Sequence, residues 1–487
     1  MLPKRLFLAA MRLALAGIVF SAGCMEPKWP NGPLTARDES SGYRFEALQL
    51  GEGNTDDVFV FLCFSGGGTR AAALAYGVLQ GLRSTQLPGG VGRRTLLQEV
   101  DVISSASGGS FTAMAYGLDR DHVFDGTFER RFLKKNVQSG LVHNVLRFRN
   151  LVRLPYAALG RTDLAARYYD ESVFAHRKYG ELLQRGDRPF VVVNATNVAM
   201  GERFEFTQDD FDFLGSDLAT LPVGHAVAAS SAYPVLLSPL RLKYYPGEAC
   251  SSALKAVADW KGTAQEHSRR YKWAASLVPE PRPGEMPRCE LDAPNHEFLF
   301  LLDGGLTDNL GAGYVLDELR CGGTRERIMQ NRVKHLVVIL VDANTDVPER
   351  IEHRSASPGL FAAAFRAGSI GVYTHSMIRT QEMRFLLRDY RDKIAEISKL
   401  CREQFSRCCP DHDVAPVLRS PPVQTYLVNV NFHDIADSRE RRKFLSMPTS
   451  LFLRNEQVDD LIKIGAELLA GNAEIKRLQA AMQAAGG

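Results

Sequence analysis

The chain has 487 residues, 45% of them hydrophobic and 24% charged, which is enough apolar material for a large folded core. The formal net charge is +3, and three basic residues stand near the amino terminus before any acidic one. The rest of the chain is therefore close to neutral. This charge balance does not suggest a nucleic-acid-binding protein, and we expect no nucleic-acid partner.

The amino end has the pattern of an export signal. Lys4 and Arg5 precede an apolar stretch over residues 6–20, and the small residues 21–23 stand directly before Cys24. This order predicts a secretory signal peptide over residues 1–23. An uncleaved anchor is the alternative, but the apolar stretch is shorter than the about 20 residues that a membrane-spanning helix needs.

Cys24 directly after the small residues resembles the lipobox of bacterial lipoproteins, in which the cysteine is acylated and becomes the new amino terminus. We expect this lipid to anchor the protein in the bacterial cell envelope, because each buried methylene contributes about 0.8 kcal/mol. Met25-Glu26 lacks the aspartate associated with inner-membrane retention, which favours the outer membrane. The polar residues 24–55 are predicted to form a tether. An ordinary cleaved signal is the alternative.

A body of alternating strands and helices is expected over residues 56–454. Residues 58–64 form a continuous apolar run that is too short for a buried helix, so the run predicts a strand covered on both faces. Helical spacing follows over residues 71–82. The same order recurs with a strand over 100–103 and a helix over 111–118. Further strands are predicted at 190–193, 298–302, 335–341 and 425–430.

This alternation predicts an α/β fold with a largely parallel sheet. Two insertions interrupt it. Residues 119–188 are helical in pattern and are a candidate lid, whereas residues 241–296 are polar and rich in proline. Residues 141–153 mix apolar and basic positions as an interfacial helix does, and a cap helix packed on the core is the equal alternative. Residues 455–487 predict a helical tail.

The eight cysteines fit export to an oxidising compartment. If Cys24 is acylated and Cys63 is buried in its strand, up to three disulfides can form among Cys250, Cys289, Cys321, Cys401, Cys408 and Cys409. Cys250 and Cys289 bracket the second insertion, so we predict a disulfide between them. No metal site is predicted, because the last three cysteines lack paired C-x-x-C spacing.

Ser107 is the candidate nucleophile for acyl transfer. It follows a predicted strand, precedes two glycines and opens a helix, which is the setting of a nucleophile elbow. Ser105 replaces the first glycine of the G-x-S-x-G pattern but keeps a small residue at the tight point. Ser104, Ser105 and Ser110 are rival nucleophiles, but only Ser107 has small residues on both sides at the required offsets. A Ser/Gly turn that caps a helix is the alternative.

Gly66-Gly67-Gly68 is the candidate oxyanion hole, with the N–H of Gly108 as a further donor. Consecutive glycines before a helix leave N–H groups unpaired and let a substrate approach the backbone closely. A nucleotide-binding loop is not predicted, because neither a GKS or GKT ending nor a third spaced glycine follows. Arg70 is expected to steady this loop through carbonyl hydrogen bonds or to meet an anionic head group. A surface ion pair is the alternative.

Asp303 is the candidate proton acceptor. It ends the apolar run over residues 298–302 and enters Gly304-Gly305. A carboxylate at the carboxyl end of a strand is well placed to accept the Ser107 proton, whereas a turn or capping aspartate is the alternative. An ordinary aspartate is a poor base for a hydroxyl group, so the site is expected to be partly dry.

These motifs, in this order, resemble the patatin-like phospholipase family. Residues 66–70 match its G-G-G-x-R/K oxyanion loop, Ser107 matches the nucleophile of its G-x-S-x-G motif, and Asp303 with Gly304 matches its D-G-G/A motif. Residues 226–234 resemble its A-S-x-A-x-P segment. A weaker resemblance to the family is found at Met447-Pro448-Thr449-Ser450.

The resemblance covers about residues 56–310. It implies a three-layer α/β/α sandwich and a Ser-Asp dyad that cleaves carboxylic esters of phospholipids or lysophospholipids without a metal or other cofactor. A Ser-His-Asp triad would need a histidine after the acid. None of the candidates, His335, His353, His375, His412 and His433, stands in a recognisable catalytic setting. The alternative is a non-catalytic envelope lipoprotein that uses the scaffold to bind a membrane or a partner.

Overall fold

The structure is a computed structural model. It describes residues 29–486, except 37, 39, 89–93, 147–159, 235, 280–287, 293–296, 346–359 and 409–422. The predicted signal peptide, Cys24 and the first residues of the tether lie outside the described residues. So does the second half of the predicted interfacial helix, while α4 (Val137–Leu146) covers its first half.

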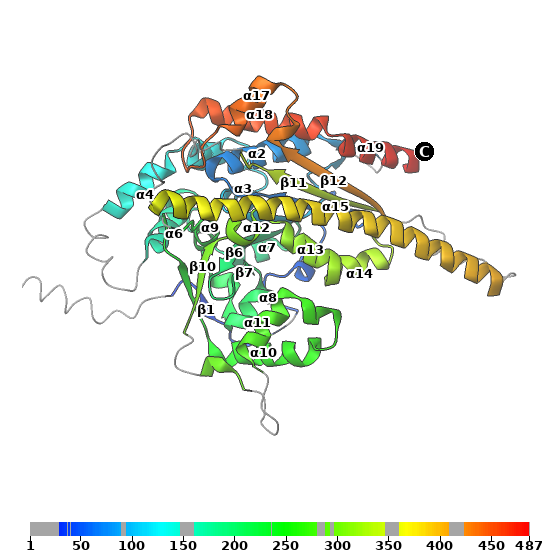
Figure 1. The fold of residues 1–487 in the computed structure, drawn as a ribbon, viewed down its shortest axis with the longest axis horizontal. Coiled ribbons are helices and arrows are strands. Elements are labelled where there is room, and N and C mark those ends of the chain that lie inside the picture. The colour runs from blue at the N-terminus through cyan, green and yellow to red at the C-terminus, as the bar shows by residue number, and fades with distance from the viewer. Residues whose placement is uncertain are drawn as a thin grey trace, which may run out of the picture.

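A mixed sheet forms the centre of the protein (Figure 1). Within the described residues it has eight strands: β2 (Val58–Phe64), β5 (Val100–Ala106), β6 (Phe190–Asn197), β7 (Glu202–Glu205), β9 (Leu240–Lys243), β10 (Phe298–Asp303), β11 (His335–Asp342) and β12 (Gln424–Asn431). Strands β12, β11, β2, β5 and β6 are parallel neighbours in that order. At the other edge β10 pairs antiparallel with β6 and with β9. The predicted, mostly parallel sheet is confirmed.

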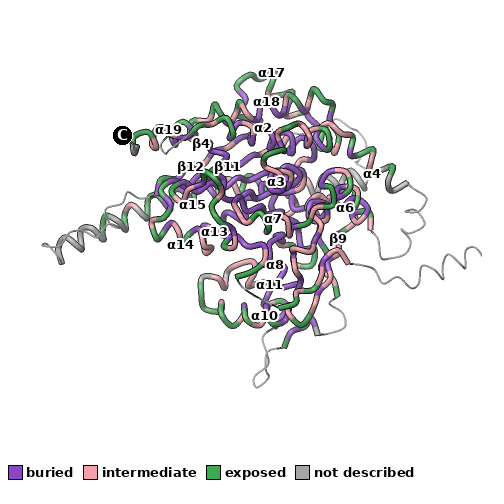
Figure 2. The backbone as a smooth tube through the Cα atoms, turned by 180° about the vertical axis from the view of Figure 1, so that it is seen from behind, coloured by how far each residue is buried: buried purple, intermediate pink, exposed green. Residues whose placement is uncertain are grey.

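The central strands are buried along their whole length, as their apolar runs predict. Every residue of β2 is buried, including Cys63. Helices cover both faces of the sheet, so neither face needs polar side chains. Figure 2 shows the same pattern as a buried centre whose exposed residues lie on the outer helices and loops.

Helices on the two sides of the sheet complete the predicted three layers (Figure 1). One layer contains α2 (Gly68–Ser84), α3 (Gly108–Leu118), α18 (Asn455–Gly471) and α19 (Ala473–Gly486), and the other contains α12 (Gly305–Asp308), α13 (Ala312–Cys321), α14 (Gly323–Met329) and the long α15 (Leu360–Cys408). The tail belongs to the body, because a Cβ added to Gly77 of α2 would lie 2.1 Å from Ile462 O of α18. Among the described residues, no helix has the length and hydrophobicity needed to cross a bilayer.

The first insertion is helical, as predicted. It contains α4, α6 (Arg161–Ser172) and α7 (Tyr179–Arg185). Helix α6 packs against α9 (Val223–Ser230), and its buried Tyr169 meets the ring of Phe111 edge-on at 4.9 Å between centroids. Helix α6 is therefore part of the core and differs from the predicted lid.

The second insertion folds into helices that the polar, proline-rich sequence did not predict. It contains α10 (Pro246–Trp260) and α11 (Arg269–Leu277). The buried Trp273 of α11 packs against the ring of Phe213, with 5.2 Å between the ring centroids. The predicted disulfide between Cys250 and Cys289 is confirmed. Cys321, one of the candidates for a further bridge, is a free thiol.

The predicted tether over residues 24–55 is too long. Asn31 is buried, and its side-chain amide both donates a hydrogen bond to Lys243 O and accepts one from Lys243 N. Strand β1 (Gly32–Pro33) pairs with β8 (Ser216–Asp217). Further along, the buried Tyr43 accepts a hydrogen bond from Val191 N at 2.8 Å. Apolar burial of Tyr43 and its neighbours stabilises this segment against the body, so Asn31 and Tyr43 belong to the folded body and not to a tether.

Candidate active site

Ser107 stands at a strained turn between β5 and α3. Its backbone has φ 48° and ψ −119°, a combination that is rare for a residue with a side chain. Such strain is typical of a nucleophile elbow, where the sharp turn presents the hydroxyl group at the edge of the sheet. The turn is held by Ser230 of α9, whose Oγ accepts a hydrogen bond from Ser107 N at 2.8 Å.

The structure brings the predicted nucleophile and the predicted acid together. Ser107 Oγ donates a hydrogen bond to Asp303 Oδ2 at 2.9 Å, and Gly305 N donates to Asp303 Oδ1 at 2.7 Å. Burial raises the pKa of Asp303 to about 7, although these two hydrogen bonds lower it. Within the described residues, the Asp303 carboxylate is hydrogen-bonded to Ser107 Oγ and Gly305 N and to no histidine side chain.

Asp303 is the last residue of β10, as predicted, but this strand does not run parallel to its neighbours. We expected it at the carboxyl end of a strand in a largely parallel sheet, but β10 runs antiparallel to β6 and overlaps it over residues 301–303 only. Asp303 pairs with Ala195 of β6, and the preceding Asn194 pairs with Ala106, directly before Ser107. The register of this antiparallel pair therefore sets the position of the acid next to the elbow.

The glycine loop lies against the elbow. A Cβ added to Gly108 would be 2.2 Å from Gly68 O, so the two backbones touch. Gly67 and Gly68 have φ of 138° and 63°, which favours glycine. Within the described residues, the N–H groups of Gly67, Gly68 and Gly108 have no hydrogen-bond partner, as an oxyanion hole requires.

Gly66 differs from its predicted role as an oxyanion donor. Its N–H donates to Asn309 O at 2.9 Å, so it is already used inside the protein. A Cβ added to Gly66 would lie 2.5 Å from Asn309 Oδ1 and 3.1 Å from Ser107 Cβ. Gly66 therefore allows the loop to approach both residues. The candidate oxyanion donors are the N–H groups of Gly67, Gly68 and Gly108.

Arg70 is buried beneath the glycine loop. It donates hydrogen bonds to Ala343 O (2.8 Å), Met447 O (2.7 Å) and Thr449 Oγ1 (3.0 Å). These are the carbonyl hydrogen bonds of the predicted supporting role, and they leave no place for a head group or a surface ion pair. Thr69 N also donates to Ser450 O at 2.9 Å. The segment over residues 447–450 is thus the outer support of the glycine loop.

Two residues of the site were missed in the sequence. Ser230 lies in the segment that resembles A-S-x-A-x-P, and its Oγ also donates to Asn194 O at 2.6 Å. Asn309 is 4% exposed and joins the glycine loop to α15, because its Nδ2 donates to Ser376 Oγ at 3.4 Å. Their only signal in the sequence was proximity to predicted motifs.

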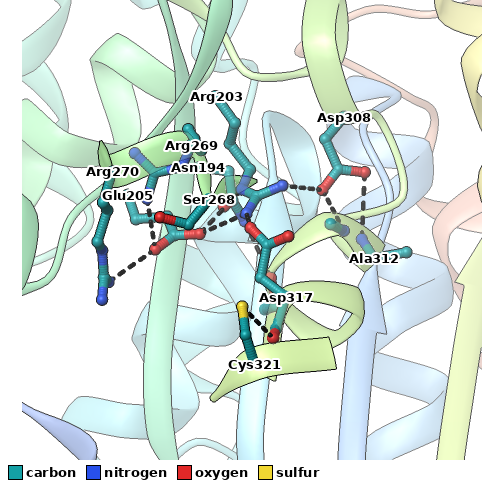
Figure 3. Close-up of polar contacts among 12 residues, drawn as sticks. Asn194, Arg203, Glu205, Ser268, Arg269, Arg270, Asp308, Ala312, Asp317 and Cys321 are labelled. Carbon is teal, nitrogen blue, oxygen red and sulfur yellow. Dashed lines mark hydrogen bonds and ion pairs between the residues drawn. The ribbon is translucent and has the colours of Figure 1, made fainter. Parts of the chain in front are cut away.

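A buried ionic network supports the turn that follows Asp303 (Figure 3). Asp308 accepts hydrogen bonds from Ala312 N and Gly313 N at the start of α13 and faces Arg203 of β7 at 4.0 Å. Arg203 also pairs with Glu205 at 2.7 Å, and Glu205 pairs with Arg269 of α11 at 2.9 Å. The network therefore joins the second insertion to the segment that carries Asp303.

The chain matches the family model of patatin-like phospholipases over residues 62–316, more than half of its length. It belongs to the patatin-like phospholipase family. A search of curated proteins finds no match to the chain.

Solved structures give remote likenesses. Human GIVD cytosolic phospholipase A2 has a TM-score of 0.44 and 13% identity over 88% of this chain and 63% of that chain. The same enzyme in complex with methyl gamma-linolenyl fluorophosphonate has a TM-score of 0.42, 13% identity and coverage of 88% and 60%. VipD from Legionella pneumophila has a TM-score of 0.30 and 11% identity over 88% of this chain and 67% of that chain. The chain thus spans less than two thirds of the human phospholipase.

Proposed function

We propose that this protein is a serine acyl hydrolase that cleaves carboxylic esters of phospholipids or lysophospholipids, with Ser107 as nucleophile and Asp303 as base. The observation that carries the proposal is the 2.9 Å hydrogen bond from Ser107 Oγ to Asp303 Oδ2. The strained elbow and the three unpartnered N–H groups beside it support the same chemistry.

In the proposed reaction, Ser107 Oγ attacks the ester carbonyl carbon while its proton passes to Asp303 Oδ2. The N–H groups of Gly67, Gly68 and Gly108 bind the oxyanion of the tetrahedral intermediate, and loss of one such donor typically costs about 3 kcal/mol. The intermediate collapses to an acyl-enzyme, and the leaving alkoxide takes the proton from Asp303. Water then attacks the acyl-enzyme in the same way, gives its proton to Asp303 and releases the fatty acid as Ser107 is reprotonated.

The test compares the parent with Ser107→Ala and with Ser251→Ala, a change at an exposed serine of α10. We expect fatty-acid release from phospholipid or lysophospholipid micelles by the parent and by Ser251→Ala, and only background release by Ser107→Ala. A fluorophosphonate should label the parent once, at Ser107. Release by Ser107→Ala at the parent rate refutes the mechanism. Absence of both turnover and labelling in the folded parent favours the non-catalytic scaffold.

We also propose that the protein is anchored in the outer membrane through an acylated Cys24. The support is the order of the leader residues and the cysteine that follows them. Labelled palmitate should be incorporated by the parent and lost in Cys24→Ser, and the parent should fractionate with outer membranes. Fractionation of unlabelled parent with soluble envelope proteins refutes the anchor.

A further inference from the structure

Helix α15 exposes large apolar side chains along one side. The exposed apolar residues are Ile370, Tyr373, Met377, Ile378 and Phe385, and Phe385 is 73% exposed. The other side of the helix is buried through Ser376, Met383 and Leu387. Scattered exposed apolar residues are common, but a run of them on a single helix needs an explanation.

These residues share an arc with two arginines. At 3.6 residues per turn, one continuous side of the helix contains residues 370, 373, 374, 377, 378, 381, 384, 385 and 388, which we call the α15 arc. All of them are exposed, and none is acidic; the first acid on this side, Asp392, stands one turn beyond Arg388 and is paired with Arg391. An apolar arc that carries basic residues and no acid is typical of a helix that lies in a membrane interface.

The arc keeps its positive charge. Arg384 and Arg388 have no ion-pair or hydrogen-bond partner within the residues that the structure describes. Two further acids lie close by but outside the arc, and both are paired: Glu382 with Arg320 and Arg379, and Asp389 with Lys393. Two free guanidinium groups beside apolar side chains complement a surface of anionic lipid head groups.

The arc is carried by a helix that packs on the candidate active site. Ser376, on the buried side of α15, accepts the hydrogen bond from Asn309, and His375 Nδ1 lies 3.2 Å from Leu306 O of α12. Leu306 is three residues from Asp303. Figure 1 shows α15 running across the front of the molecule, where it packs on α12. The buried side of α15 therefore contacts residues that support the dyad, and the arc lies on the opposite, exposed side of the same helix.

We infer that the α15 arc docks the protein on an anionic phospholipid bilayer, with its apolar side chains in the interface and its arginines among the head groups. The inference rests on the proposed function, because the bilayer then supplies the substrate. A second copy of the chain is a poorer occupant: a twofold contact of arc on arc would bring arginines together with no acid to balance them.

The test measures partition onto vesicles of phosphatidylcholine alone or with anionic phosphatidylserine. Every protein is the full chain with Cys24→Ser, which removes any acyl anchor, and Ser107→Ala, which keeps the vesicles intact. The arc variants are Arg384→Glu with Arg388→Glu, and Ile378→Ser with Phe385→Ser. The matched control, Lys463→Glu with Lys476→Glu, makes the same charge change at exposed positions of α18 and α19.

We expect the parent and the control to prefer anionic vesicles, with binding that weakens as salt is added. The variant with Arg384→Glu and Arg388→Glu should bind anionic vesicles at least about 30-fold more weakly than the parent, because each basic residue contributes about 1 kcal/mol at an anionic surface. Equal binding of the arc variants and the parent overturns the inference, as does sedimentation showing a dimer that the arc variants dissociate.

Hydrolysis of a soluble short-chain ester separates this inference from the proposed function. With Ser107 intact, the arc variants should hydrolyse that ester at the parent rate, because they retain the dyad and the glycine loop. Parent protein that binds anionic vesicles but never hydrolyses esters keeps the inferred surface and refutes the enzyme. Parent protein that hydrolyses the ester but shows no preference for anionic vesicles refutes the inferred surface.

Discussion

Replacing Asp303 with asparagine should stabilise the protein at alkaline pH while abolishing its activity. Asp303 is 4% exposed, and burial raises its pKa from 3.8 to about 7. Between these two values, the folded protein keeps a proton that the unfolded chain has released. The contribution of Asp303 to the stability of the parent is therefore greatest below about pH 4 and falls as pH rises, until the folded carboxylate is ionised above about pH 7.

The size of the effect follows from the same two values. A tenfold change in proton affinity is worth about 1.4 kcal/mol, so a rise from 3.8 to about 7 corresponds to about 4 kcal/mol. The Asp303→Asn side chain is neutral at every pH, and its carbonyl oxygen still accepts the hydrogen bond from Gly305 N. We expect the variant to match the parent near pH 4 and to exceed its unfolding free energy by about 4 kcal/mol at pH 8.

Urea unfolding followed by tryptophan fluorescence at pH 4 to 8 measures this difference. Asp57→Asn is the matched control, because it makes the same chemical change at a side chain that is 55% exposed, where no such pH-dependent gain is expected. The kcat/KM of the parent should rise with the same midpoint near pH 7, since only the ionised carboxylate accepts a proton. A stability difference that does not grow with pH, or a parent more stable than the variant at pH 8, refutes the description of Asp303 as a buried, proton-binding base.

Three further substitutions test the support of the site. Ser230→Ala leaves the buried N–H of Ser107 without its acceptor, which should cost about 1–3 kcal/mol in urea unfolding and lower kcat about tenfold; an unchanged kcat argues against a positioning role. Gly108→Ala places a Cβ 2.2 Å from Gly68 O, so kcat should fall about 100-fold or more while circular dichroism stays that of the parent. Arg70→Lys keeps the charge but loses the fork of donors, and we expect a lower thermal midpoint together with a lower kcat. A lower midpoint with full activity would mean that Arg70 supports only the fold.

Several features followed from short stretches of sequence alone. The apolar run over residues 58–64 predicted a doubly covered strand, because seven successive apolar residues can be satisfied only between two layers. Small residues around Ser107 predicted the elbow, since the turn leaves no room for larger neighbours. The disulfide between Cys250 and Cys289 followed from two cysteines that flank one insertion.

Features that depend on distant segments were predicted incompletely. The helices of the second insertion are stabilised by contacts such as that of Arg269 with Glu205, which no local pattern reveals. The sequence left three roles open for Arg70: hydrogen bonds to carbonyl groups, contact with an anionic head group, or a surface ion pair. Its actual partners lie more than 270 positions away in sequence, so no local pattern could choose between these roles. Gly66 was included among the oxyanion donors because nothing in the sequence indicates that Asn309 O accepts its N–H.

The sequence by itself determined which residues can do chemistry, because a strained turn, a run of glycines and a buried strand each restrict the local residue types. Only the tertiary structure decided how these pieces meet. The antiparallel direction of β10 and its register on β6 set the contact between Asp303 and Ser107. The hydroxyl of Ser230 sets the turn at the nucleophile. Strand direction and register depend on pairing between segments about a hundred residues apart, and short-range sequence patterns carry no record of that pairing.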